Sequence, residues 1–151
     1  MGVEVLVIGD DGIRPLEALA AEASALQTAL ANCKVRLFQS TLSGPSEFTN
    51  LAALDAAEAT FSGYTTGGVT VTAAGEPYID LEASNMLVPL PSVQFNFLTP
   101  EEGDPVTNTI GGAYVVDSAG KLRGVQKFSS NRVMSGDLNS IQVAISFRVK
   151  N

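Results

Sequence analysis

Acidic side chains occupy the few positions in this sequence where chemistry could be placed. Asp80 and Glu82 alternate with apolar residues along a predicted strand, so both carboxylates would share one face. Two carboxyl groups held close together are the pair that glycoside hydrolysis uses. The same spacing is common on an exposed strand face of any acidic protein, and we favour that interpretation.

Two further acidic runs could hold a hard cation such as Ca²⁺, which takes oxygen ligands. They are Asp10-Asp11, which precedes a predicted helix, and Glu101-Glu102-Gly103-Asp104. Neither has the ligand spacing of a Ca²⁺-binding loop, and both fit solvated turns. The pairs Gly67-Gly68 and Gly111-Gly112 lack the strand-to-helix context of a phosphate loop, so we expect turns or a β-bulge there.

The side chain that most often activates a nucleophile or binds a metal is missing from the chain. The sequence contains no histidine, which excludes a Ser-His-Asp triad, a Cys-His pair and a histidine-ligated metal. Its one cysteine, Cys33, cannot form an internal disulfide, and we expect it to be a small buried apolar residue. The sequence therefore predicts a protein that is not an enzyme, with no catalytic, cofactor-binding or metal-binding residues.

The charge and hydropathy limit the partners. The chain has 16 Asp and Glu against 9 Lys and Arg, a formal net charge of -7, so we expect no nucleic-acid partner. Charged residues are 17% of the chain, below the ~25% usual in soluble domains, which indicates a neutral-polar surface partly hidden against neighbouring subunits. No apolar run approaches the ~20 residues of a membrane span, and the run at residues 3–8 lacks the features of a signal peptide. We therefore expect no membrane partner.

Two helices are expected. Residues 14–31 are rich in Ala and Leu, which are strong helix formers. Their apolar positions are spaced three and four apart on one stripe, namely Leu16, Leu19, Ala23, Leu26 and Leu30. We expect this stripe to pack on the protein's own sheet; a contact between helices of identical subunits is the alternative. A short helix over residues 51–59, capped by Thr49 or Asn50, is also expected.

The rest of the chain is typical of short antiparallel strands joined by turns. The predicted strands are residues 3–8, 34–40, 69–72, 78–82, 86–98, 107–117, 121–129 and 141–149. Pro89 and Pro91 confine part of one strand to an edge or a bulge. Asp117-Ser118-Ala119-Gly120 predicts a hairpin turn, and residues 131–137 a loop.

These elements predict a mainly β fold, an antiparallel β-sandwich or a small jelly-roll-like barrel, with one N-terminal helix and one short helix. We expect one domain over residues 1–151, with a helix-containing part at 1–65 and a β-rich part at 66–151, because a separate 65-residue domain would be marginal. The expected core consists of Leu37, Phe61, Val93, Phe95, Phe97, Tyr114, Val116, Phe128, Ile141, Val143, Ile145 and Phe147.

Four segments in a fixed order resemble known proteins. They are residues 34–40, the run Glu58-Ala59-Thr60-Phe61-Ser62-Gly63-Tyr64, the run Val93-Gln94-Phe95, and residues 108–116 with a return strand at Leu122 and Lys127-Phe128. In this ordered set the chain resembles a diverse group of small structural proteins of tailed phages and prophages. The match covers most of residues 34–149. It departs at Lys127, where the group usually has Arg.

The resemblance implies a non-enzymatic virion component, and capsid cement or decoration proteins are among the members of this group. Such a protein would bind the major capsid protein on the outer capsid surface and be assembled in the host cytoplasm. Closed symmetry at repeated capsid sites would make a homotrimer the expected state. A tail, fibre-base or baseplate subunit is the alternative in the same class. A host-surface glycan-binding module is the alternative from another class, although the chain has no Trp and only three Tyr to stack on sugars.

Overall fold

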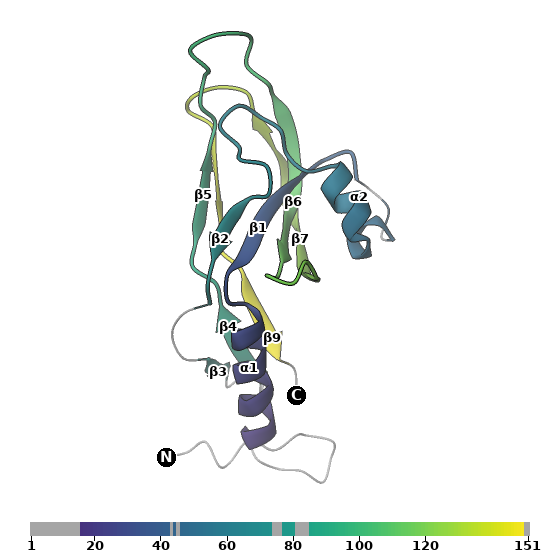
Figure 1. The fold of residues 1–151 in the computed structure, drawn as a ribbon, viewed down its shortest axis with the longest axis vertical. Helices are drawn as coiled ribbons and strands as arrows, with labels where there is room; N and C mark the ends of the chain where they lie inside the picture. Colours follow the sequence, from purple (N-terminus) through teal and green to yellow (C-terminus); the bar gives the residue numbers. More distant parts are fainter. Residues whose placement is uncertain (1–15, 43, 45, 74–76, 81–84, 150–151) are drawn as a thin grey trace. The chain divides into compact units, whose positions relative to one another are not determined.

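The computed structural model describes residues 16–42, 44, 46–73, 77–80 and 85–149 (Figure 1). Antiparallel sheets dominate this part of the chain, with one long and one short helix, so the expected fold class is confirmed. The described sheets do not close into a barrel. The chain divides into two compact units. Unit 1 comprises Met1–Ala31, Thr72–Pro91 and Ala144–Asn151, and unit 2 comprises Asn32–Val71 and Ser92–Val143. Neither unit ends at the boundary considered near residue 66.

Unit 1 contains a helix and a three-stranded antiparallel sheet in the order β3-β4-β9. Its elements are α1 (Leu16–Ala29), β3 (Tyr78–Asp80), β4 (Asn85–Pro89) and β9 (Ser146–Val149). Three residues of the predicted stripe, Leu19, Ala23 and Leu30, are buried, and α1 contacts β4 and β9. The stripe therefore packs on the protein's own sheet, as expected.

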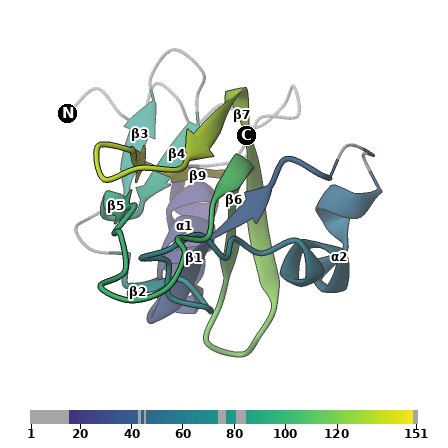
Figure 2. The same cartoon turned by 90° about the horizontal axis from the view of Figure 1, so that it is seen from above.

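Unit 2 contains a four-stranded antiparallel sheet in the order β2-β1-β6-β7 and a ribbon of β5 and β8. The strands are β1 (Cys33–Gln39), β2 (Val69–Val71), β5 (Val93–Asn96), β6 (Asn108–Val116), β7 (Leu122–Met134) and β8 (Ser140–Val143). Helix α2 (Leu51–Ala56) and the 3-10 turn η2 (Glu47–Thr49) lie on one side of the sheet, and the ribbon lies on the other (Figures 1 and 2). Residues 110–116 of β6 are all buried, as expected for a strand covered on both faces.

The pairing of β1 with β6 explains the two faces of the sheet. Arg36 pairs with Tyr114, and Phe38 with Gly112, so these residues share the face toward α2. The apolar cluster on this face consists of Phe38, Leu42, Leu54, Ala57, Tyr114 and Val116. Asn50 caps α2 by accepting hydrogen bonds from the amides of Ala52 and Ala53, which confirms one of the two predicted caps.

Gly111 and Gly112 form a β-bulge in β6, one of the two expected structures for this pair. Phe38 of β1 pairs with Gly112 and the next residue, Gln39, pairs with Ile110, so Gly111 is an extra residue in β6. A side chain on Gly112 would collide with the ring of Phe38 and the backbone oxygen of Gln126. Glycine is therefore needed because the Phe38 ring lies directly against the backbone at this point.

Two strand predictions are wrong in their extent. Residues 141–149 form two strands, β8 and β9, which pair with β5 and β4 in different sheets. Ala144 and Ile145 separate them, and this two-residue break keeps the alternation in step, so the sequence shows no interruption. Residues 131–134 are not a loop but the end of β7, where Val133 pairs with Thr109. Residues 131–133 are exposed on this edge strand, so they show no apolar alternation that would predict a strand.

The predicted core is correct at most positions. The residues confirmed as buried are Leu37, Phe61, Val93, Phe95, Phe97, Tyr114, Val116, Ile141 and Val143. Phe128, Ile145 and Phe147 are only half-buried. Phe128 and Phe147 lie on β7 and β9, which are edge strands of their sheets, and Ile145 lies in the break between β8 and β9. Large buried side chains outside the prediction include Phe38, Leu54, Ile110 and Met134.

Neighbouring residues at the end of β5 give a direct test of this core. Phe97 is 1% exposed and Leu98 is 61% exposed. Phe97→Ala should lower the free energy of unfolding by about 3–5 kcal/mol, because it removes a buried ring and leaves a cavity. Leu98→Ala, the matched control, should change it by less than about 0.5 kcal/mol. Urea denaturation measures both, and equal effects would show that the faces of this strand are wrongly assigned.

Candidate functional site

Residues 57–64 complete the hydrogen bonding of β1 where its neighbour β2 ends. Strand β2 pairs only with residues 33–35 of β1. Farther along β1, the oxygen of Leu37 accepts a hydrogen bond from the amide of Ala59 at 2.9 Å. The amide of Leu37 donates to the hydroxyl oxygen of Tyr64 at 3.2 Å. Both backbone groups of this buried residue are therefore paired without a neighbouring strand.

Glu58 holds the same segment in place through one carboxylate oxygen. Its Oε1 accepts a hydrogen bond from the Tyr64 hydroxyl at 2.8 Å and from the amide of Gly67 at 2.7 Å. Burial raises the pKa of the Tyr64 hydroxyl above its usual value, and the hydrogen bond to Glu58 raises it further. The hydroxyl thus stays protonated and can donate to Glu58 while accepting from Leu37.

The remaining residues of this run also serve packing and hydrogen bonding. The amide and the hydroxyl of Thr60 lie 2.6 and 3.3 Å from Oδ1 of Asn108. Phe61 is buried. Gly63 has a φ of 99°, and a Cβ at this position would lie 2.7 Å from the backbone oxygen of Asn96. Only glycine fits this left-handed conformation at such close approach.

A second polar cluster fixes α2 to the sheet. Asp55 Oδ1 accepts hydrogen bonds from Arg36 Nη1 at 2.8 Å and from the Tyr114 hydroxyl at 2.7 Å. Arg36 Nε donates to the backbone oxygen of Gly67 at 3.1 Å, and the guanidinium carbon lies 6.0 Å from the centre of the Tyr114 ring. These three side chains satisfy one another, so their arrangement serves to join elements of unit 2.

Asp117 organises the hairpin between β6 and β7. Its Oδ1 accepts from the amides of Ala119 and Lys121, both at 2.9 Å, and its Oδ2 accepts from Arg123 Nε at 2.7 Å. Gly120 has a φ of 83°, as the turn requires. The predicted hairpin is confirmed. The amide of Lys121 and the guanidinium of Arg123 lower the pKa of Asp117.

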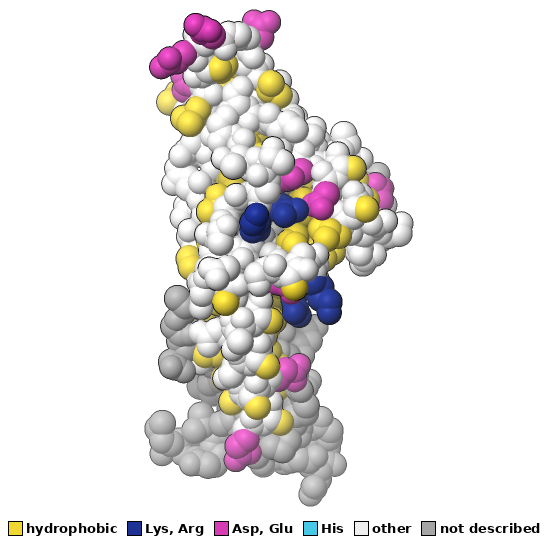
Figure 3. Space-filling view, in the orientation of Figure 1, with side chains coloured by type: hydrophobic (Ala, Val, Ile, Leu, Met, Phe, Trp, Pro, Cys, Tyr) yellow, Lys and Arg dark blue, Asp and Glu magenta, His cyan; other side chains and the backbone are white. Residues whose placement is uncertain are grey.

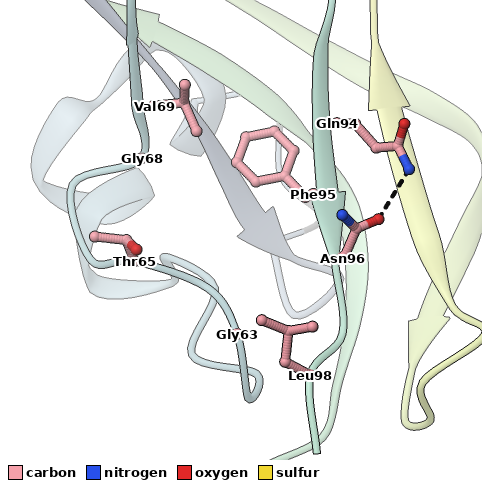
Figure 4. A pocket seen from close by; sticks show the side chains of 8 residues that line it. All are labelled: Gly63, Thr65, Gly68, Val69, Gln94, Phe95, Asn96 and Leu98. Atoms are coloured by element: carbon pink, nitrogen blue, oxygen red, sulfur yellow. Dashed lines mark hydrogen bonds between the residues drawn. The ribbon is translucent and has the colours of Figure 1, made fainter.

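An open pocket of about 360 Å³ lies in unit 2 between the sheet and the ribbon (Figure 4). Its lining consists of Gly63, Thr65, Gly68, Val69, Gln94, Phe95, Asn96 and Leu98. The Phe95 ring points into the pocket in Figure 4, and Gln94 Nε2 donates to Asn96 Oδ1 at 2.9 Å. This lining combines apolar side chains with amide and hydroxyl groups and carries no charge, which suits a neutral ligand group.

The positions considered for catalysis or metal binding do not converge in the described part of the chain. Cys33 is buried, its Sγ lies 3.5 Å from the oxygen of Val71, and burial raises the pKa of its thiol. This environment fits the small buried apolar residue that was expected. Gly67 and Gly68 both have positive φ angles in a turn, as expected.

The acidic runs remain separate from one another. The side chains of Glu101, Glu102 and Asp104 are exposed in the loop between β5 and β6, where Figure 3 shows a group of acidic side chains. The described residues contain no group of three or more Cys, Asp or Glu placed to hold a metal ion. Asp10-Asp11, Glu82 and the side chain of Asp80 lie outside what the structure describes, so the expected exposed placement of Asp80 and Glu82 stays a prediction.

Sequence reasoning missed both the Arg36–Asp55–Tyr114 cluster and the pocket. The cluster joins residues from β1, α2 and β6, and the pocket joins residues 63–69 with residues 94–98. Neither leaves a local spacing pattern, because the residues meet only when the strands pair. The exposed amides of Gln94 and Asn96, opposite the apolar residues of the same strand, were the one available signal.

No family model, no curated protein and no solved structure matches this chain. Within the described residues, none of the helices has both the length and the apolar character to cross a membrane. The segments on which the expected resemblance to phage structural proteins rests lie in unit 2, where the run from Glu58 to Tyr64 hydrogen-bonds β1 beyond the end of β2.

The two tyrosines of these clusters should differ in their effect on stability. Tyr64→Phe leaves the buried amide of Leu37 without its partner, which should cost about 1–3 kcal/mol. Tyr114→Phe removes a bond to Asp55, whose side chain is 41% exposed and can bind water instead, so about 0.5–1.5 kcal/mol is expected. Chemical denaturation of both variants measures the difference. A larger loss for Tyr114→Phe would contradict the role given to Tyr64.

The lowered pKa of Asp117 predicts a dependence of stability on pH. Its folded-state pKa lies below that of the unfolded chain, about 4. The ionised carboxylate therefore stabilises the fold above about pH 4, and this contribution is lost as the pH falls through the folded-state pKa. Asp117→Asn should lower the melting temperature at pH 7 and reduce its further decrease between pH 5 and pH 2.

Thermal unfolding followed by circular dichroism across this pH range tests the prediction. Ser118→Ala, an exposed change in the same turn, is the matched control and should follow the unmodified protein. If Asp117→Asn retained the full decrease at low pH, the hairpin carboxylate would not be a source of acid sensitivity.

Proposed function

We propose that this chain is a non-enzymatic structural protein of a tailed-phage particle, and that it acts as a capsid cement or decoration protein. It binds the major capsid protein on the outer face of the shell. The proposal rests on one observation: the residues that carry the resemblance to phage structural proteins have structural roles in this fold. Glu58, Thr60, Phe61, Gly63 and Tyr64 are all used in hydrogen bonds or packing within unit 2.

Polar side chains that are used to hold the fold together favour a protein that works by binding a partner and not by catalysis. The side chains in unit 2 that could transfer protons, such as Glu58 and Tyr64, are bonded to each other and to the backbone. Their geometry favours a fixed shape, which a subunit repeated over a shell requires.

The charge of the chain supports the outer location. A net charge of -7 would be repelled by packaged DNA, so the outer face of the shell is favoured over the inner one. Homotrimers fit the repeated sites of such a shell, because closed symmetry matches the local symmetry axes. Light scattering on the purified protein tests this, and a strict monomer with or without capsids would contradict the trimer.

The function is tested on capsids assembled without this chain. Purified protein added to them should raise the temperature at which they open, since a ligand that binds only the intact shell stabilises it by RT ln(1 + [L]/Kd). This amounts to about 2.7 kcal/mol per site at a hundredfold excess over Kd. Binding to free DNA should be absent.

Scanning calorimetry with and without the protein gives the answer, and an unrelated acidic protein of similar size is the control. An unchanged opening temperature, with binding confined to isolated tails, would replace the proposal by a tail subunit. Binding to host-surface glycans alone would replace it by a glycan-binding module.

A further inference from the structure

Strand β5 has one edge that the described chain leaves open. Its other edge pairs with β8, where Gln94 lies opposite Gln142 and Phe95 opposite Ile141. The same register continues at Phe97, whose amide donates to the oxygen of Asn139 at 3.0 Å. In an antiparallel ladder every second residue bonds the partner strand, so Phe95 and Phe97 direct their backbone groups toward β8.

Gln94, Asn96 and Leu98 must then direct their backbone groups to the opposite side. Leu98 confirms this, because its amide donates to the oxygen of Ser62 at 2.9 Å. The loop at Gly63 covers the oxygen of Asn96. Among the described residues, the amides of Gln94 and Asn96 and the oxygen of Gln94 have no hydrogen-bond partner on this side.

The pocket lies along this open edge. Val69 of β2 and Gln94, Phe95 and Asn96 of β5 line it, and Figure 4 shows β5 running along one side with the Phe95 ring inside. An edge strand with free amides and carbonyls is a template for another strand. A pocket beside such an edge accepts alternate side chains of the added segment.

The charges around the pocket indicate which segment fits. The pocket lining is uncharged, so the side chains that enter it are uncharged as well. Beyond Leu98 the chain continues into Glu101, Glu102 and Asp104, whose side chains are exposed. A segment that pairs antiparallel with Gln94 and Asn96 has its N-terminal end toward this acidic loop, with the loop at Ser62 and Gly63 between them, and a basic side chain at that end would be attracted to the three carboxylates.

We propose that this groove binds an extended polypeptide segment of a partner chain, added as a strand to the open edge of β5. The segment has small apolar or hydroxyl side chains over the pocket and a basic residue at its end toward the acidic loop at 101–104. That the segment comes from a capsid subunit rests on the proposed function. That β5 binds an added strand does not depend on it.

A synthetic peptide provides the probe: acetyl-Lys-Lys-Thr-Val-Thr-Val-Thr-amide, with its basic end placed for antiparallel addition to β5. In ¹H–¹⁵N spectra of the full chain, the peptide should shift the amide signals of Gln94 and Asn96 and slow their hydrogen exchange. The amides of Phe95 and Phe97 already bond the ribbon and should change less. A peptide with Glu in place of both Lys should bind at least tenfold more weakly.

Backbone pairing is tested on both partners. The peptide methylated on alternate amide nitrogens should bind at least tenfold more weakly to the unchanged protein. On the protein, Asn96→Pro removes one amide of the open edge without removing a bond to β8, and proline is tolerated on edge strands. Asn96→Ala keeps this amide and is the matched control, so it should retain binding.

Three results would overturn the proposal: no shift at Gln94 and Asn96, equal binding of the methylated peptide, or the same shifts with maltose and none with the peptide. The last result would make the groove a sugar site. If the peptide binds as described but capsids gain no stability, the strand-binding groove is supported and the proposed function is contradicted. If capsids are stabilised while the peptide does not bind, only the groove proposal fails.

Discussion

The structure of unit 2 depends on one constraint, which is the unequal length of two paired strands. Strand β1 spans Cys33–Gln39, whereas β2 covers only its first three residues. Leu37 is fully buried, and its backbone groups need partners because unpaired polar groups in a core are costly. The amide of Ala59 and the hydroxyl of Tyr64 supply these partners. The segment from Ala59 to Tyr64 is therefore held in place because β1 has no neighbouring strand at Leu37.

This solution also decides how the sheet and the ribbon of unit 2 meet. After its bond to β1, the segment turns at Gly63 and places the Tyr64 ring on Phe95, with a separation of 5.7 Å between the ring centres. The oxygen of Ser62 bonds Leu98 beyond the end of β5. The loop thus takes the place of a strand at one end of the gap only. The remainder of the gap is the open edge and its pocket.

Local patterns in the sequence are sufficient for the elements that are determined locally. The Asn50 cap, the turn at Asp117 and Gly120, and the apolar stripe of α1 depend on residues within a few positions of one another. The break at Ala144 and Ile145 was missed because it spans two residues and leaves the alternation unchanged. The length of β7 was missed because an exposed edge strand needs no apolar residues. The polar clusters and the groove depend on strand order, which alternation does not specify.

The apolar positions show the same distinction. Phe95 in β5 and Phe97 just beyond its end alternate with exposed residues, and the sequence places both in the core correctly. Phe38 follows the buried Leu37 directly, so alternation would expose it, yet it is buried beneath α2 on the opposite face of the sheet. A strand covered on both faces breaks the two-residue period. Recognising it requires knowledge of what packs on each side.

The most direct measurement of the proposed function is an electron-microscopy reconstruction of phage particles whose genome encodes this chain, at a resolution that separates β-strands. The account predicts density for unit 2 on the outer face of the capsid shell, in contact with the major capsid protein and repeated around its symmetry axes. Density for this chain only in the tail, or a particle with none, would contradict the assignment to the capsid surface.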